Sequence, residues 1–271
     1  MSGAQRVALV TGASTGIGAS CAGFLATKGF RVYGGARGAV TAPGVEPLSL
    51  DVTADASVTQ AVELVLSREG RLDILVNNAG FGIAGAIEDT SIEEAREQFE
   101  VNFFGVLRMC RAVLPTMRGQ KSGTIVNIGS IGGLIAIPFQ GFYSATKFAL
   151  EGFSESLRLE VRPFGIQVVL IEPGDHRTAF TENRRATRES HAESAYHDRF
   201  KRAVARMAQD EQGGPSADGV AKLLHKILEN PHPRLRYTVG PPAQRAAVWI
   251  KRLMPYALME RIMHDYYEGK R

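Results

Sequence analysis

The sequence predicts a single α/β domain in which helices cover both faces of one doubly wound parallel sheet of about seven strands. Short apolar runs alternate with longer amphipathic segments, which is the order of elements in β-α-β units. These runs are rich in Val, Ile and Leu without alternation, which indicates strands buried on both faces. No linker, repeat or low-complexity tract divides the 271 residues, so we expect one domain over residues 1–271.

The expected strands follow the apolar runs in order along the chain. They are Arg6–Thr11, Arg31–Gly34, Glu46–Leu50, Leu72–Asn77, Gly123–Ile128, Ile166–Glu172 and Arg236–Val239. The expected helices are Gly16–Lys28, Ala54–Glu69, Ile92–Arg118, Ser144–Pro163 and Ser216–Asn230. The third and fourth helices are long enough to extend past the sheet, so we expect them to form the contacts of a homodimer or homotetramer.

Composition excludes several classes of function. The net charge of +4 is small and dispersed, which does not favour a nucleic-acid-binding protein. Two cysteines, Cys21 and Cys110, form no disulfide framework or zinc pattern, and the histidines include no His-x-x-x-His pair, so no metal site is predicted. The sequence shows no secretory signal and no apolar run of about 18 residues, which favours a cytoplasmic location.

Two regions interrupt the alternation of strands and helices. Residues 175–214 are highly charged and irregular, and they follow the sixth strand at the edge where open α/β sheets bind ligands. A solvated surface helix is the simple alternative to a substrate lid there. The tail, residues 243–271, mixes basic and apolar side chains and is divided by Pro255. It is expected to pack over the substrate site or against a neighbouring subunit, with weak membrane contact as the alternative.

A glycine-rich loop directly follows the first strand. Its residues are Gly12, Ser14, Thr15, Gly16, Ile17 and Gly18. Glycines at this spacing allow a tight turn and a close approach to a pyrophosphate, and the helix that follows presents free N–H groups to the phosphates. The position at the end of a buried first strand therefore predicts a dinucleotide site, although glycine clusters alone are often only turns.

The end of the second strand indicates which dinucleotide binds. NAD-preferring enzymes usually place an acidic residue there, but the first acidic residue of the chain is Glu46. Arg37 follows this strand instead, and its guanidinium can pair with the 2′-phosphate of NADP. We therefore expect NADPH to be preferred over NADH. The alternative is that Arg37 is an ordinary exposed arginine.

Polar residues close the next two strands. Asp51 and Val52 end the third strand, where the aspartate can accept a hydrogen bond from an adenine amino group or cap the helix that follows. Asn77 is expected to brace the central strands. The residues after it are expected to border the cofactor: Asn78, Ala79 and Gly80.

A serine, a tyrosine and a lysine carry the expected chemistry. Ser130 follows the fifth strand, and Tyr143 and Lys147 are four residues apart, on one face of a helix. A free tyrosine titrates near ~10, and burial raises that value further. We expect the Lys147 ammonium, with an oxidised nicotinamide ring, to lower the pKa of the phenol enough for acid–base work.

Together these residues make the sequence resemble the short-chain dehydrogenase/reductase family, over essentially Arg6 to Val239. The motifs are TGxxxGIG, NNAG, an asparagine in FEVNFFG, the serine, YxxxK and a Pro-Gly pair. The resemblance implies a Rossmann-type fold and the catalytic set Asn102, Ser130, Tyr143 and Lys147. Tyr143 would be the general acid/base, Ser130 would hold the substrate oxygen, and Lys147 would also hold the nicotinamide ribose.

The same resemblance assigns the remaining site residues. Asn102 would hold a water in a proton relay, and Pro173, Gly174 and Thr178 would border the nicotinamide. Asp175, His176 and Arg177 are unusually charged for this loop. They contact either a cofactor phosphate, a polar substrate end or solvent.

The substrate is expected to be lipophilic. The stretch Ile131–Phe142 borders the catalytic residues and is almost wholly apolar, which suits a fatty ketone or alcohol. The resemblance to the hydroxysteroid and retinol dehydrogenase branch favours a steroid, retinoid or fatty carbonyl. The alternatives are reduction of a 3-oxoacyl thioester, which uses the same residues, and a non-catalytic NADP-binding sensor. A sensor is expected to have lost part of the Ser, Tyr and Lys set, which is intact here.

Overall fold

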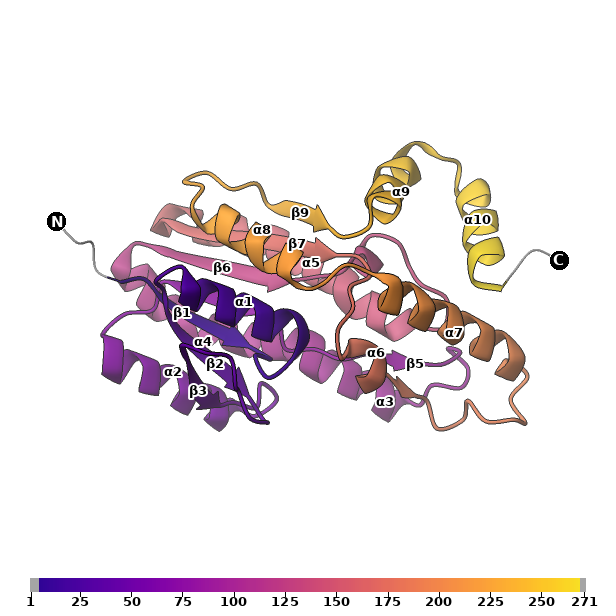
Figure 1. Ribbon diagram of the computed structural model, residues 1–271, viewed down its shortest axis with the longest axis horizontal. Coiled ribbons are helices and arrows are strands. Elements are labelled where there is room, and N and C mark those ends of the chain that lie inside the picture. The colour runs from indigo at the N-terminus through magenta and orange to yellow at the C-terminus, as the bar shows by residue number, and fades with distance from the viewer. Residues whose placement is uncertain (1–4, 269–271) are drawn as a thin grey trace.

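The computed structural model describes residues 5–268. Within them, seven strands form one parallel sheet in the order β3-β2-β1-β4-β6-β7-β9, which confirms the doubly wound fold (Figure 1). The strands are β1 (Val7–Thr11), β2 (Arg31–Ala36), β3 (Val45–Ser49), β4 (Ile74–Asn77), β6 (Gly123–Ile128), β7 (Ile166–Pro173) and β9 (Arg236–Val239). Each lies within two residues of its predicted position.

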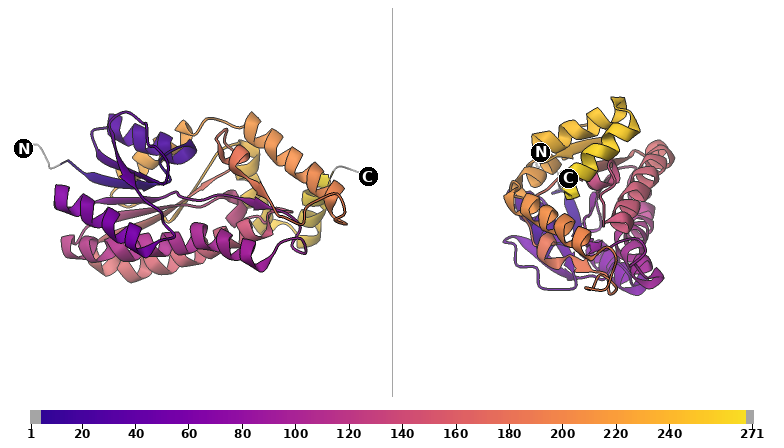
Figure 2. Two further views of the ribbon diagram at one scale, coloured as in Figure 1. Left: turned by 90° about the horizontal axis from the view of Figure 1, so that it is seen from below. Right: turned by 90° about the vertical axis from the view of Figure 1, so that its right-hand side faces the viewer.

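Two layers of helices enclose the sheet (Figure 2, left). One layer contains α2 (Asp55–Glu69), α4 (Gly105–Gln120) and α5 (Gly141–Val161), and the other contains α1 (Gly16–Thr27) and α8 (Asp218–Leu228). Successive side chains of a strand point to opposite faces, so in β1 Leu9 packs into the first layer and Val10 into the second. Burial on both faces explains why the strands lack polar alternation.

The predicted helix Ile92–Arg118 has three parts. It consists of α3 (Ile92–Phe99), a π-helical turn η1 (Glu100–Phe104) and α4. Ser91 caps α3 by accepting from the Glu94 backbone N–H, while the Glu94 carboxylate accepts from the Ser91 N–H. The π turn carries Asn102, and such turns are frequent at functional sites.

The predicted start of the next helix at Ser144 is wrong by three residues. Helix α5 begins at Gly141, after a loop that contains Phe139 at a φ of 59°. Tyr143 therefore lies in the first turn of α5, and Lys147 follows one turn later on the same face.

Residues 175–214 are more regular than predicted. They form α6 (Phe180–Asn183), the short strand β8 (Arg185–Ala186) and α7 (His197–Gly213). Strand β8 pairs in parallel with β5 (Ile83–Ala84), a contact between segments far apart in sequence. Helix α7 is stable despite its charge because Phe200, Ala203 and Met207 make a narrow buried stripe.

The tail forms two helices separated at Pro255, as its sequence predicts. These are α9 (Pro242–Leu253) and α10 (Tyr256–Glu268), and they stand at the carboxyl end of the sheet, clear of both helix layers (Figure 1). A small apolar cluster around Ile135, Val248 and Met259 joins them to the body of the protein. No helix among the described residues is both long and apolar enough to cross a lipid bilayer.

Candidate active site

One cavity of about 930 Å³ extends from the glycine loop after β1 to the tail helices. It is lined by most of the residues predicted to bind cofactor or substrate: Gly12, Ser14, Thr15, Gly16, Ile17, Arg37, Asp51, Val52, Asn78, Ala79, Gly80, Ser130, Tyr143, Lys147, Pro173, Gly174 and Thr178. Two predicted residues, Gly18 and Asn102, do not line it. Residues separated by more than 160 positions in the chain therefore meet at one edge of the sheet.

The glycine loop forms a cradle that suits a phosphate group. Gly12 and Gly16 have φ values of 65° and 57°, which favour glycine. Gly18 packs so closely under the loop that a Cβ atom there would overlap the Gly12 carbonyl oxygen and the Asn78 amide. No side chain caps the N-terminus of α1, and its first turn holds no acidic residue. Its N–H groups therefore remain available to an anion, and the residues fit a dinucleotide pyrophosphate.

Two asparagines brace this end of the sheet. The Asn78 amide donates to the backbone oxygens of Thr11 (2.9 Å) and Gly12 (3.1 Å), which holds the loop against β4. The Asn77 amide donates to Asn127 (2.9 Å), whose own amide donates to Ser154 (2.8 Å). Asn77 thus has the bracing role expected from its position.

Arg37 and Asp51 lie at the outer end of the cavity. Arg37 is exposed just beyond β2 and lines the cavity. Asp51 accepts hydrogen bonds from the backbone N–H and hydroxyl of Thr53, and these bonds hold the pKa of its carboxyl below the usual range. Asp51 does not cap α2, because the N-cap of that helix is Ala54. That predicted alternative is wrong.

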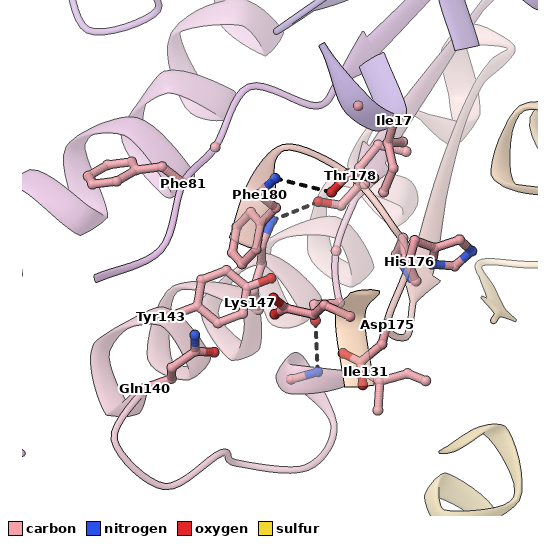
Figure 3. A pocket seen from close by; sticks show the side chains of 18 of the residues that line it. Ile17, Phe81, Ile131, Gln140, Tyr143, Lys147, Asp175, His176, Thr178 and Phe180 are labelled. Atoms are coloured by element: carbon pink, nitrogen blue, oxygen red, sulfur yellow. Dashed lines mark hydrogen bonds between the residues drawn. The ribbon is translucent and has the colours of Figure 1, made fainter. Parts of the chain in front are cut away.

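Ser130, Tyr143 and Lys147 all line this cavity, where Figure 3 shows Tyr143 and Lys147 next to one another. Ser130 follows β6, and its hydroxyl accepts from the Gly132 N–H at 2.9 Å. The Lys147 ammonium donates to the Ile128 backbone oxygen at 2.9 Å and lies 5.8 Å from the centre of the Tyr143 ring. A hydroxyl, a phenol and a cation therefore converge on one small volume.

The titration of this group differs from the expectation in one respect. Burial raises the pKa of Tyr143 to about 12, although contact with the Ser130 side chain opposes the increase. Burial also lowers the pKa of Lys147 to about 8. Desolvation is thus the largest influence on the phenol in the protein alone, and the expected decrease in its pKa is not seen there.

Asn102 is buried beside this group rather than in the cavity. It is 1 % exposed, and its side chain accepts from the Phe81 N–H (3.1 Å) and donates to the Phe81 oxygen (3.0 Å). Both polar atoms of the amide are thus used to hold the segment after Gly80. The role of Asn102 in a proton relay stays a prediction.

Glu172, which the sequence did not indicate as a site residue, lies next to Ser130. It is completely buried, and its carboxylate accepts from the Ser130 N–H at 2.7 Å. Burial raises its pKa well above the ordinary value. Its neighbour Glu151 is held by an ion pair with Arg236. A buried carboxyl bonded to the Ser130 backbone fixes the direction of that serine.

The inner part of the cavity is mainly apolar. Phe180 of α6 faces Tyr143, with ring centres 5.6 Å apart (Figure 3). Other apolar lining residues come from the loop after β6 and from the tail: Ile131, Ile135, Ile137, Ala247, Ile250, Met254, Met259, Ile262 and Met263. The sequence predicted that the loop residues line the substrate site. It did not predict the methionines there, because their position depends on how α9 and α10 fold back over the cavity.

The charged loop after Gly174 divides between cavity and surface. Asp175 and His176 line the cavity, while Arg177 is exposed and does not. Gln244 of α9 holds Asp175 by accepting from its N–H at 2.9 Å and donating to its carboxylate. One ring nitrogen of His176 is bonded to the Gly174 oxygen at 2.9 Å. Among the described residues, no group of His, Cys, Asp and Glu side chains is placed to hold a metal ion.

Comparison with known proteins agrees with this geometry. A family model described as short chain dehydrogenase matches residues 6–189. The chain is 43 % identical to a 3-ketodihydrosphingosine reductase of Bacteroides thetaiotaomicron, over 97 % of this chain and 98 % of that protein. It is 37 % identical to human 17-beta-hydroxysteroid dehydrogenase type 1, over 86 % and 77 % of the two chains. A crystal structure of a Burkholderia phymatum short chain dehydrogenase/reductase in complex with NAD covers 92 % of this chain and 93 % of that one, with a TM-score of 0.78 and 26 % identity.

Proposed function

Because the chain belongs to the short-chain dehydrogenase/reductase family and is an oxidoreductase, we propose that it uses NADP(H) to interconvert a lipophilic ketone and its alcohol. The main support for this proposal is that a single cavity is lined by the glycine loop at Gly12, by Ser130, Tyr143 and Lys147, and by apolar residues of the tail. A sensor without turnover has no need for the intact catalytic group.

The proposed roles follow from the chemistry of each side chain. A bound nicotinamide supplies the hydride in reduction and accepts it in oxidation. The Ser130 hydroxyl donates to the substrate oxygen, where negative charge develops. Tyr143 gives its proton to that oxygen in reduction and removes the hydroxyl proton in oxidation. Lys147 stabilises the phenolate form, and Glu172 positions Ser130 through its backbone N–H.

The shape and polarity of the chamber favour a long apolar substrate with one polar end. Many of the wall residues are aliphatic or methionine side chains, while Asp175 and Glu211 provide carboxylates. The relative that acts on 3-ketodihydrosphingosine supports a fatty ketone as the first candidate, and the hydroxysteroid relative supports a steroid as the second. A 3-oxoacyl thioester remains the alternative, because it uses the same catalytic residues.

A turnover screen tests the proposed function. We expect NADPH oxidation with 3-ketodihydrosphingosine or a steroid ketone, and slower turnover of retinal and of short 3-oxoacyl thioesters. The measurement is loss of absorbance of the reduced nicotinamide over a matched substrate series. Faster turnover of acyl thioesters than of every free ketone would replace the proposal with its alternative.

The preference for NADPH rests on Arg37. Replacing Arg37 with alanine should weaken NADPH binding by about tenfold to a hundredfold, because a charge-assisted hydrogen bond to a phosphate contributes roughly 1.5–3 kcal/mol. NADH binding should change little. Arg162→Ala, which removes another exposed arginine outside the cavity, is the matched control. Equal effects of Arg37→Ala on both dinucleotides, measured by calorimetry, would contradict the proposed preference.

We further propose a homo-oligomer and a lid. The π turn η1 exposes Phe104, and helix α5 exposes Phe148 and Leu159, which suits burial against a second copy of the chain. Residues 175–214 contribute Phe180 and Glu211 to the cavity wall, so movement of this segment would open or close the substrate chamber.

A further inference from the structure

The tail helices expose large apolar side chains on the side that faces away from the sheet. Leu253 is 90 % exposed, Tyr256 is 77 % exposed and Trp249 is 64 % exposed. Three such residues within eight positions are unusual on a protein surface in water. The two helices project beyond the rest of the molecule (Figure 2, right), and the exposed fractions show that these three side chains are mostly uncovered.

Packing within the chain does not explain why these side chains are apolar, because other residues of the same helices make the contacts with the rest of the protein. Val248 and Met259 are buried in the apolar cluster around Ile135. The Lys251 ammonium donates to the Leu134 backbone oxygen at 2.5 Å. The outward residues are therefore free to contact something outside the chain.

The charge of α9 selects the kind of partner. Arg245 and Arg252 are exposed on this helix, which contains no acidic side chain, while Lys251 is turned to the body and α10 carries Glu260, Asp265 and Glu268 beside Arg261. Arg245, Trp249 and Arg252 are spaced by four and three residues, so they share one face of α9. The Arg252 guanidinium lies over the Trp249 ring, 5.2 Å from its centre. Tryptophan and leucine beside arginine suit the boundary between anionic headgroups and acyl chains.

The same surface borders an entrance to the cavity. Ile250 and Ile262 line the cavity and are also 47 % and 44 % exposed, so they belong to both. Met254, between the two helices, lines the cavity as well. Apolar side chains of the tail thus lie both at the surface and in the wall of the cavity that contains Tyr143.

We propose that the outer face of α9 and α10, formed by Arg245, Trp249, Arg252, Leu253 and Tyr256, docks on an anionic lipid surface. Together with the proposed function, this docking means that a lipid ketone enters the chamber from the bilayer past Ile250 and Ile262. The contact is peripheral: the side chains reach the headgroup boundary, and the helices lie along it.

Trp249 makes the docking directly measurable, because it is the single tryptophan of the chain. Its fluorescence should shift to shorter wavelength with vesicles of phosphatidylglycerol, and much less with vesicles of phosphatidylcholine. Salt should reverse the shift, since headgroup attraction is screened. Leu253→Glu should weaken vesicle binding by about tenfold or more. Ile92→Glu, at a 61 % exposed isoleucine on α3, should leave vesicle binding unchanged.

Two results would overturn the docking. One is the absence of a shift with either kind of vesicle. The other is a shift that grows with protein concentration without vesicles, which would mean that a second copy covers this face. The binding measurement needs no turnover, so it stands apart from the proposed function. If Trp249 responds to anionic vesicles but no ketone is reduced, docking holds and the proposed function fails.

Turnover provides a second readout. Leu253→Glu should raise KM for a ketone carried in anionic vesicles by about the same factor as it weakens binding, and leave KM for a water-soluble short-chain ketone unchanged. Leu253 does not line the cavity. An equal rise in KM for both substrates would contradict entry from the bilayer.

Discussion

Tyr143→Phe should lower turnover by about three orders of magnitude, while the affinity for NADPH stays within about twofold. The reason is that the phenol supplies the proton in the chemical step, and a positioned acid or base typically contributes a factor of about 10²–10⁴. The ring, which packs at 5.6 Å from Phe180, is retained in this variant. The measurements are kcat for ketone reduction and dinucleotide binding by calorimetry.

Tyr196→Phe is the matched control, because it removes a phenol that is hydrogen-bonded to Glu88 outside the cavity. It should leave kcat unchanged. A Tyr143→Phe enzyme that keeps more than about a tenth of the original kcat would show that another group transfers the proton.

The pH dependence of the two directions should have opposite signs. Burial raises the pKa of Tyr143 to about 12 in the protein alone. The phenol therefore keeps its proton for reduction at neutral pH, whereas oxidation needs the phenolate. Alcohol oxidation should become faster as pH rises towards the phenol pKa in the complex, and reduction should slow over the same range. Profiles of kcat against pH in both directions measure this.

Gly18→Ala should weaken dinucleotide binding by about a hundredfold and lower Tm. The new methyl group would overlap the Gly12 carbonyl oxygen and the Asn78 amide, so α1 must move away from the loop. Overpacking of this kind typically costs about 1–3 kcal/mol, and the movement also displaces the N–H groups that face the phosphates.

Gly23→Ala, in the same helix, separates this effect from that of a glycine substitution in general. A methyl group there would meet only the Ala42 Cβ atom at 3.7 Å, an ordinary contact. Its Tm should stay equal or rise, because alanine favours a helix interior. Unchanged NADPH affinity in Gly18→Ala would show that the cradle does not require close packing at that position.

The parts of this molecule that could be predicted from sequence depend on local patterns. The strands around Leu9 and Val10 are continuous apolar runs, and the glycine loop and the Tyr143–Lys147 spacing are short motifs. Each of these signals is complete within about ten residues. They place the sheet and most of the cavity lining, because parallel strands bring their carboxyl ends to one edge.

The parts that could not be predicted depend on contacts between distant segments. Strand β8 exists because Arg185 pairs with Ile83, about a hundred residues earlier in the chain. The sequence indicates only that Glu172 ends a strand, and the folded structure is needed to place it against the Ser130 backbone. The pKa of Tyr143 also depends on burial, which cannot be deduced from the four-residue spacing between Tyr143 and Lys147.

The two hydrogen bonds between Gln244 and Asp175 connect the tail to the loop that follows Gly174. If α9 swings outward, both bonds break and this loop loses its anchor beside the proposed nicotinamide site. Ordering of the loop and seating of α9 are therefore thermodynamically linked, and by reciprocity each must favour the other to the same degree.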